Sequence, residues 1–181
     1  MPAFTRQHWR ASTDPIVRVV FGEILDELAL GLVPNVFHAM APMPELLDAA
    51  WCLTRATLLR GRVSRTVKEM AGLVVSIVNA SGYSRSFCLQ SLTSRGVDVD
   101  TIARVACADV RGAGLSTRDG ALLDLARAIA LHEGKLRDAD RVAATAAGVA
   151  REEALEMAAT VQLFTSLDRF AAVAGAPPDL W

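Results

Sequence analysis

The sequence predicts an all-α protein, and three observations lead to that prediction. Apolar residues recur with helical spacing along nearly the whole chain, and no stretch alternates with the period of a β-strand. Hydrophobic residues make up 52% of the 181 residues but aromatic residues only 6%, so the excess is alanine, valine and leucine, which pack between helices. Glycine and proline fall between the periodic segments and separate one expected helix from the next. A single domain over residues 1–181 is the simplest organisation for this length.

In the first half, helices are expected over residues 15–30, 36–40, 45–60, 65–79 and 84–94. Asp14 is a good N-cap for the first of them, with Pro15 at the first helical position. Gly61 ends the third helix, and Ser64 caps the fourth. Ser84 is the expected N-cap of the fifth, because it follows a Ser-Gly-Tyr break.

In the second half, helices are expected over residues 100–109, 117–131, 138–147 and 151–174. A shift of 52 residues places Ser64 on Ser116 and Gly96 on Gly148, and it aligns the helices that follow the two serines. This pattern allows a fold of two related helical halves. The alternative is that any two helix pairs of similar length align in this way.

The charge pattern excludes some classes of partner. The 19 basic and 20 acidic residues are interspersed, and without a basic stripe no nucleic-acid partner is expected. No segment approaches the roughly 18 uninterrupted apolar residues of a membrane span. Residues 1–13 lack the apolar segment of a secretory leader and are expected to form a mobile arm or to pack on a neighbouring subunit.

Cysteine and histidine usage argues against structural metals and disulfides. Cys52, Cys88 and Cys107 are odd in number and widely spaced, so they form neither a disulfide framework nor a zinc pattern. The three histidines are scattered and suggest no metal site. No glycine-rich nucleotide-binding loop occurs, so no cofactor is expected. A reducing cytoplasm is the expected location.

The stretch from Glu69 to Cys88, EMAGLVVSIVNASGYSRSFC, combines a carboxylate with several nucleophilic or hydroxyl side chains. Glu69 precedes an almost wholly apolar run, so its helix is expected to be buried. It could act structurally, in an ion pair or in the first helical turn where a carboxylate favours the helix dipole. It could instead be a buried acid or base with a raised pKa. Taken alone, Ser84, Tyr83 and Cys88 are typical of a cap, an anchor and a core residue.

Together these residues resemble the alkylhydroperoxidase D-like family, which includes the carboxymuconolactone decarboxylases. That family carries the pattern Glu-x11-Cys-x-(His/Tyr)-Cys-x3-His, which Glu69, Ser81, Tyr83, Ser84 and Cys88 match in spacing. Segments 34–37, 44–47, 63–69 and 163–171 also look like the peroxidase-related branch of the family. The resemblance covers the chain from about residue 34 to 175. It implies an alkylhydroperoxidase D-like helical bundle that assembles as a dimer, trimer or hexamer.

The sequence departs from that family at the positions that perform its redox chemistry. In redox-active members one cysteine attacks a peroxide and the other resolves the sulfenic acid as a disulfide. Ser81 and Ser84 stand at those two positions and Cys88 at that of the relay histidine, and a hydroxyl cannot pass through this cycle. The serines could be an engineered pair, but a cysteine in place of the histidine favours natural divergence.

Three functions follow from this comparison. The first is a cofactor-free enzyme for decarboxylation, lactone, isomerisation or elimination chemistry on a small organic substrate, with Glu69 as general acid or base and Tyr83, Ser81 and Ser84 as hydrogen-bond donors. The second is a hydroperoxidase that uses Cys88 as a single reactive thiol, with Arg85 as the nearest cation in sequence. The third is a catalytically inactive binding or assembly subunit. A pocket filled by aromatic side chains would favour the third, and an open pocket around Glu69 the first.

Other residues are assigned from the resemblance or from their positions along the chain. His38 lies in a region that lines the pocket in this family, and Trp51 and Phe87 are expected to line the substrate pocket with it. The alternatives are a surface or interface role for His38 and a core role for Trp51. His132 fits the C-terminal end of a helix, where a cation is favourable. The adjacent Asp168 and Arg169 are expected to form a structural ion pair.

Overall fold

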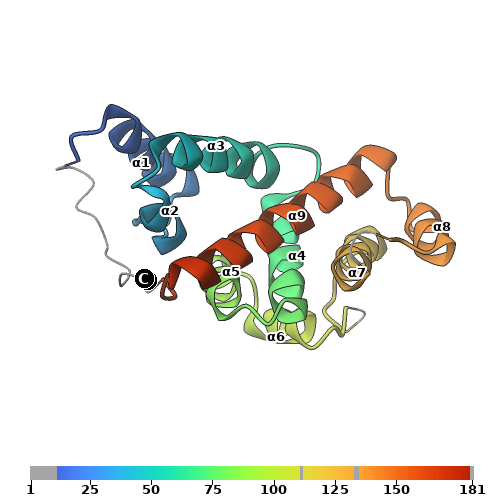
Figure 1. The fold of residues 1–181 in the computed structure, drawn as a ribbon. Helices are drawn as coiled ribbons and strands as arrows, with labels where there is room; N and C mark the ends of the chain where they lie inside the picture. Colours follow the sequence, from blue (N-terminus) through green and yellow to red (C-terminus); the bar gives the residue numbers. More distant parts are fainter. Residues whose placement is uncertain (1–11, 111, 133–134, 180–181) are drawn as a thin grey trace.

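The computed structural model describes residues 12–110, 112–132 and 135–179, and the regular secondary structure within these ranges is entirely helical (Figure 1). The elements are α1 (Pro15–Leu28), α2 (Asn35–Met40), α3 (Pro44–Thr54), the π-helical turn η2 (Arg55–Leu59), α4 (Arg65–Val78), α5 (Gly82–Ser94), α6 (Val99–Ala106), α7 (Thr117–Leu131), α8 (Asp138–Ala146) and α9 (Arg151–Ala174). The all-α prediction is confirmed. The expected N-terminal arm lies almost wholly outside the described residues.

Helix α4 lies at the centre of the bundle, and α5, α7 and α9 pack around it. The long α9 crosses the molecule and contacts α2, α5 and α7 as well, which Figure 1 shows as the red helix running past all of them. The buried apolar side chains form two clusters, one around α4 and one between α1, α2 and α3. Tyr83 on α5 and Ala171 on α9 belong to the second cluster, and so connect it to the main bundle.

Side-chain caps explain where several helices begin. Asp14 Oδ1 accepts hydrogen bonds from the backbone N–H groups of Ile16 at 2.8 Å and Val17 at 3.2 Å, as predicted for the start of α1. Ser64 Oγ accepts from the N–H of Val67 at 3.3 Å at the start of α4. Each cap satisfies N–H groups that the first helical turn leaves without a partner.

Several predicted helix boundaries are wrong. The helix expected over residues 15–30 ends at Leu28, and the one expected over 100–109 ends at Ala106. Helix α5 begins at Gly82, and its N-cap is Ser81, whose Oγ accepts from the N–H of Ser84 at 3.3 Å. Ser84 therefore lies inside the first turn, because Gly82 starts this helix where the sequence suggested a break. The α-helix expected to reach residue 60 changes at Arg55 into the π-helical turn η2, which apolar periodicity does not distinguish from an α-helix.

The two halves share local conformation at the positions that the 52-residue shift aligned. Ser64 and Ser116 are both N-caps, of α4 and α7. Gly96 and Gly148 both have a left-handed backbone, with φ of 76° and 80°, just after α5 and α8. Helices α6 and α9 begin directly after these turns at equivalent positions. The repeat of helix starts and turns agrees with the proposal of two related halves.

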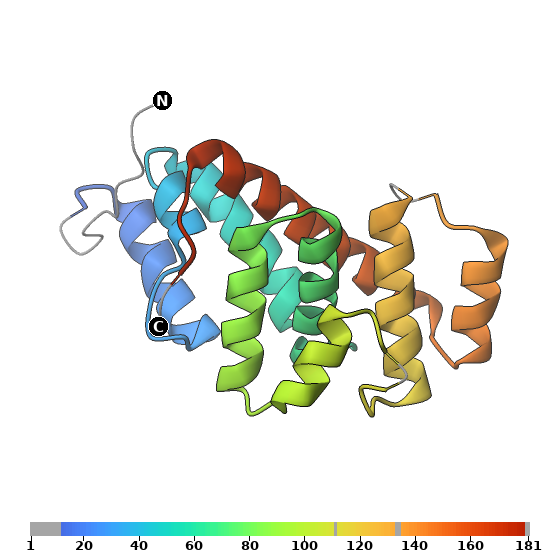
Figure 2. The same cartoon turned by 90° about the horizontal axis from the view of Figure 1, so that it is seen from below.

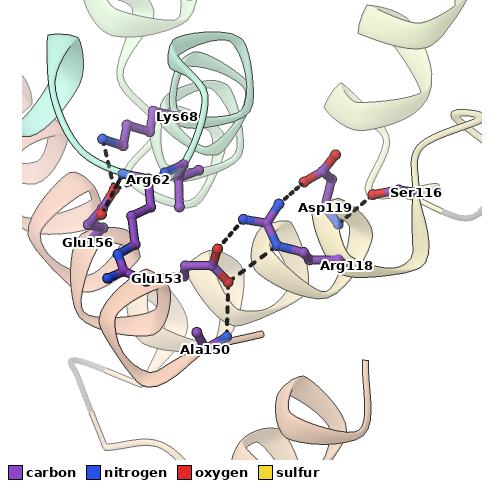
Figure 3. Close-up of polar contacts among 9 residues, drawn as sticks. Arg62, Lys68, Ser116, Arg118, Asp119, Ala150, Glu153 and Glu156 are labelled. Carbon is purple, nitrogen blue, oxygen red and sulfur yellow. Dashed lines mark hydrogen bonds and ion pairs between the residues drawn. The ribbon is translucent and has the colours of Figure 1, made fainter. Parts of the chain in front are cut away.

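A polar network attaches α9 to the rest of the bundle (Figure 3). The carboxylate of Glu156 accepts from the backbone N–H groups of Arg62 at 2.7 Å and Val63 at 3.0 Å, and from the buried Lys68 ammonium at 3.1 Å. A Cβ at Gly61, where φ is +105°, would collide with this carboxylate. The positive φ favours glycine there, and a larger residue would also have to displace the Glu156 carboxylate from its hydrogen bonds.

The Glu156 contacts predict a loss of stability in acid. Burial opposes ionisation, but the hydrogen bonds from Arg62, Val63 and Lys68 outweigh it and lower the pKa of Glu156. A carboxyl whose folded pKa lies below its unfolded value of about 4.3 stabilises the fold above that value and stops doing so as pH falls through the folded pKa. The stability gap between the wild type and Glu156→Gln should therefore shrink below about pH 4. Chemical denaturation from pH 3 to 7 measures it.

The exposed Glu152 on the same helix provides the control, because Glu152→Gln removes only the exposed interaction of a first-turn carboxylate with the helix dipole and should change stability far less than Glu156→Gln. A gap between wild type and Glu156→Gln that stays constant down to pH 3 would contradict the prediction.

Candidate functional site

The turn from Ser81 to Ser84 joins α4 to α5 and lies between two hollows. An open groove of about 430 Å³ lies on one side, lined by Asn79, Ala80, Ser81, Gly82, Tyr83, Asp168, Arg169, Ala172 and Ala176. A small apolar cavity of about 20 Å³ lies on the other, lined by Leu28, Pro34, Val36, Phe37, Thr54, Leu58, Tyr83, Ser84, Phe87, Leu163, Phe164 and Leu167. The cavity has room for about one water molecule. The two serines at the family's cysteine positions thus contribute to different hollows, and Tyr83 to both.

Tyr83 is held from two directions. Its hydroxyl accepts from the backbone N–H of Val36 on α2 at 3.0 Å and donates to Asp179 Oδ2 in the C-terminal segment at 2.7 Å. The side chain is buried. Both hydrogen bonds hold the ring between α2 and α5, so in this arrangement the hydroxyl is already engaged by protein groups.

Glu69 lies at the centre of a buried ion cluster. Its Oε1 pairs with Arg65 Nε at 2.8 Å, and its Oε2 with Arg95 Nε at 3.1 Å. Ser91 Oγ also donates to Oε2 at 2.9 Å. The carboxylate has no exposed surface and lines neither hollow. Glu69 lies beyond the first turn of α4, so the predicted helix-dipole role is wrong and the ion-pair role is the one its contacts support.

Cys88 is buried in the main core with no exposed surface. Burial raises the pKa of its thiol well above the ordinary value, and the nearby negative charges of Glu69 and Asp168 raise it further. Arg85, the cation nearest in sequence, is exposed. A reactive cysteine needs a stable thiolate and access for its substrate, and this environment favours the neutral thiol instead.

Asp168 is a site residue that the sequence reasoning missed. Its Oδ2 accepts from Asn79 Nδ2 at 2.8 Å, whereas its Oδ1 is buried without a hydrogen-bond partner within the described part of the chain. Within the described residues it forms no ion pair with Arg169, which is exposed, so that prediction is wrong. A signal was present, because Asp168 is a carboxylate four residues after Phe164 and three before Ala171, on the buried stripe of α9.

The predicted pocket residues fall in different places. Phe87 lines the apolar cavity. Trp51 and His38 lie in the separate core of α1, α2 and α3 and line neither hollow. Trp51 Nε1 donates to Glu23 Oε2 at 2.8 Å, and the His38 ring packs edge-on against Phe21 with centroids 4.9 Å apart. Both residues therefore serve the N-terminal packing in this structure.

Two features are absent from the described residues. No group of three His, Cys, Asp or Glu side chains is arranged to hold a metal ion there. None of the helices in the described ranges has the length and apolar character needed to cross a bilayer.

Comparison with known proteins identifies structural relatives. No protein-family model and no curated protein matches the chain. Among solved structures, an alkylhydroperoxidase AhpD core, an uncharacterised peroxidase-related protein from Ralstonia eutropha JMP134, is 25% identical with a TM-score of 0.82, covering 97% of this chain and 91% of that one. A peroxidase-related protein from Silicibacter sp. TM1040 is 23% identical with a TM-score of 0.80, covering 97% and 92%. The debrominase Bmp8, as a cysteine-to-alanine variant in complex with 2,3,4-tribromopyrrole, is 19% identical with a TM-score of 0.80, covering 96% and 89%.

Proposed function

Given that this chain has the alkylhydroperoxidase D-like fold, we propose that it is a non-redox protein of that fold that binds a small organic molecule in the groove at Ser81 and transfers a proton to or from it without a cofactor. The observation that carries the proposal is Asp168. It lines the groove, and its buried Oδ1 meets no hydrogen-bond donor among the residues that the structure describes. A buried carboxylate oxygen without a donor is costly, so a substrate that supplies an N–H, O–H or acidic C–H group offsets that cost.

The roles within the site follow from the geometry. Asp168 is the proposed general acid or base, since it is the carboxylate on the groove wall. Ser81 lines the same groove and is the proposed hydroxyl contact to the substrate. Glu69 is proposed to position α4 relative to the end of α5 rather than to contact substrate, because Arg65 and Arg95 hold its two oxygens below the surface. Ser84 and Phe87 line the cavity, and Tyr83 lines both the cavity and the groove.

A ligand of the relative supplies a suitable probe. 2,3,4-Tribromopyrrole, bound by the Bmp8 variant, is a small ring with one N–H donor and one remaining ring C–H. We expect Asp168→Asn to weaken its binding about 10- to 100-fold, the effect of losing one hydrogen bond to a charged group. Calorimetric titration measures this, with the exposed Asp26→Asn as matched control. Equal affinity of wild type and Asp168→Asn would contradict the assignment of the groove.

Proton transfer has its own readout. In D₂O the deuterated carboxyl of Asp168 should deliver a deuteron to the unsubstituted ring carbon of the bound pyrrole, and the resulting carboxylate should then take the proton from that same carbon. The ring C–H is thereby exchanged for C–D, which proton NMR follows as the loss of one signal. Exchange should be at least tenfold slower with Asp168→Asn. Binding without exchange by the wild type would instead favour the binding-subunit function, which the small size of the cavity beside Tyr83 and Phe87 also supports.

The hydroperoxidase alternative is disfavoured by the burial of Cys88. A thiol reagent applied to the native protein should modify the exposed Cys52 and Cys107 and leave Cys88 unmodified until the protein is denatured. Mass spectrometry of the labelled peptides measures this directly. Hydroperoxide consumption with a dithiol reductant should be absent. Turnover that disappears in Cys88→Ala would overturn the non-redox proposal.

Assembly and location belong to the same proposal. Leu46 and Leu53 on α3, and Met43 at its N-cap, are exposed apolar side chains, which supports a homo-oligomer. All three cysteines are free, which supports a cytoplasmic location. Light scattering combined with size-exclusion chromatography gives the number of subunits.

A further inference from the structure

The segment after α9 turns back over the bundle. Helix α9 ends at Gly175, whose φ of 63° is left-handed, and residues 176–179 then run beside α2 and α5 (Figure 2). Asn35 Nδ2 donates to the carbonyl of Pro177 at 3.1 Å, and Gln90 Nε2 donates to the carbonyl of Asp179 at 2.6 Å. We call residues 176–179 the C-terminal strap. Side chains of α2 and α5 therefore hold the strap at two points along its backbone.

The strap ends in a fully buried carboxylate. Asp179 Oδ1 accepts from the backbone N–H of Asn35 at 2.7 Å, and its Oδ2 accepts from the Tyr83 hydroxyl at 2.7 Å. Burying a carboxylate is expensive unless donors replace its hydration. One donor, the Asn35 N–H, belongs to α2, and the other, the Tyr83 hydroxyl, belongs to α5. We call these two donors the receptor, and the strap supplies the carboxylate that they bind.

An apolar hollow adjoins this receptor. The lining of the cavity of about 20 Å³ includes Pro34 and Val36, which flank Asn35 in the sequence, and Tyr83. Asn35 and Tyr83 are the two residues that donate to the Asp179 carboxylate. The cavity itself holds about one water molecule, so the apolar or aromatic body of a bound carboxylic acid would extend from the receptor into the space that the strap occupies. Ala176 in the strap is also a wall of the open groove, so movement of the strap would join groove, receptor and cavity.

We propose that Asp179 is an internal ligand in a carboxylate-binding site, and that a small apolar monocarboxylic acid binds there when the C-terminal strap moves away. The strap and the free acid compete for the same two donors, and the strap has the advantage of being tethered to the bundle. Tethering through a short linker corresponds to an effective concentration in the millimolar range, so free acids bind the wild type only at comparable or higher concentration. The proposal concerns binding alone and stands whether or not the groove transfers a proton.

Benzoate, with benzamide as its neutral analogue, tests the proposal on the full chain. Asp179→Ala vacates the receptor, so calorimetry should find benzoate binding at least tenfold tighter to this variant than to the wild type. Benzamide should bind neither protein measurably, because it lacks the carboxylate. Adding Tyr83→Phe to Asp179→Ala removes one donor and should weaken benzoate binding about tenfold or more. A folded Asp179→Ala variant that binds benzoate no better than the wild type would overturn the proposal.

A second measurement uses the wild type and covers the case in which Asp179→Ala fails to fold. Benzoate should displace the strap and expose it to a carboxypeptidase, so removal of residue 179, followed by mass spectrometry, should accelerate at least tenfold. Benzamide should not change the rate. Equal rates with benzoate, with benzamide and without additive would show that the strap is a fixed part of the fold, and the carboxylate site would be rejected.

Discussion

Replacing Glu69 by glutamine is expected to lower the free energy of unfolding by about 3–5 kcal/mol, the usual cost of removing one partner from a buried ion pair. Two guanidinium groups, those of Arg65 and Arg95, lose their counter-ion together. The NH₂ group of the glutamine side chain would also face guanidinium groups, which can only donate hydrogen bonds. The damage extends to α1, because Arg65 Nη2 donates to the carbonyl of Leu28 at 3.1 Å, at the end of that helix.

Glu23→Gln is the matched control for this prediction. Glu23 also has two side-chain partners, Trp51 and Arg55, but more than a third of its side chain is exposed. Water can replace the lost charge interaction there, so the expected cost is below about 1 kcal/mol. Urea unfolding of both variants gives the comparison. A stable Glu69→Gln protein that has lost deuterium exchange on the pyrrole would restore Glu69 as the acid or base and contradict its positioning role.

Gly72→Ala is the second change with a large expected effect, even though alanine normally favours a helix. Gly72 lies in α4 where α9 crosses it, and a Cβ there would lie 2.7 Å from Cε1 of Phe164 and closer still to Cζ. The Phe164 ring is buried and cannot move outward without opening the core. Overpacking of this kind costs about 1–3 kcal/mol, occasionally more. The variant should therefore be less stable in thermal and urea unfolding.

Gly22→Ala provides a control of opposite sign. Gly22 lies inside α1, and a Cβ there would have no heavy atom within 4 Å. The alanine should then stabilise the protein by about 0.5–1 kcal/mol, through its higher helix propensity. If both substitutions stabilised the protein, the close contact between α4 and α9 would not limit its stability.

Much of the fold could be predicted from local chemistry. Asp14 and Ser64 carry side chains that suit an N-cap, and both are caps in the structure. The start of α5 could not be read in the same way, because Ser81 and Ser84 are equally good caps in sequence. Only tertiary packing distinguishes them, since Tyr83 and Ser84 must lie inside the helix to reach the core.

The site was less predictable, because its chemistry depends on contacts between distant segments. Spacing marked Glu69 as buried, but its partner Arg95 lies 26 positions further along the chain. Asp168 and Asp179 could not be connected to the Ser81 turn from sequence, because α9 and the strap approach it only after folding. Burial of Cys88 was foreseen as a core property, and the two carboxylates that reinforce its neutral form were not.

The position of Tyr83 has a practical consequence for spectroscopy. It is the only tyrosine among the 181 residues, and it lies where the two apolar cores, the groove and the strap meet. A protein grown with fluorinated tyrosine would therefore give a single fluorine resonance, already assigned, at the junction of all these parts. That one signal would report separation of the α1–α3 layer, departure of the strap and arrival of a ligand, each through a different change in the surroundings of one ring.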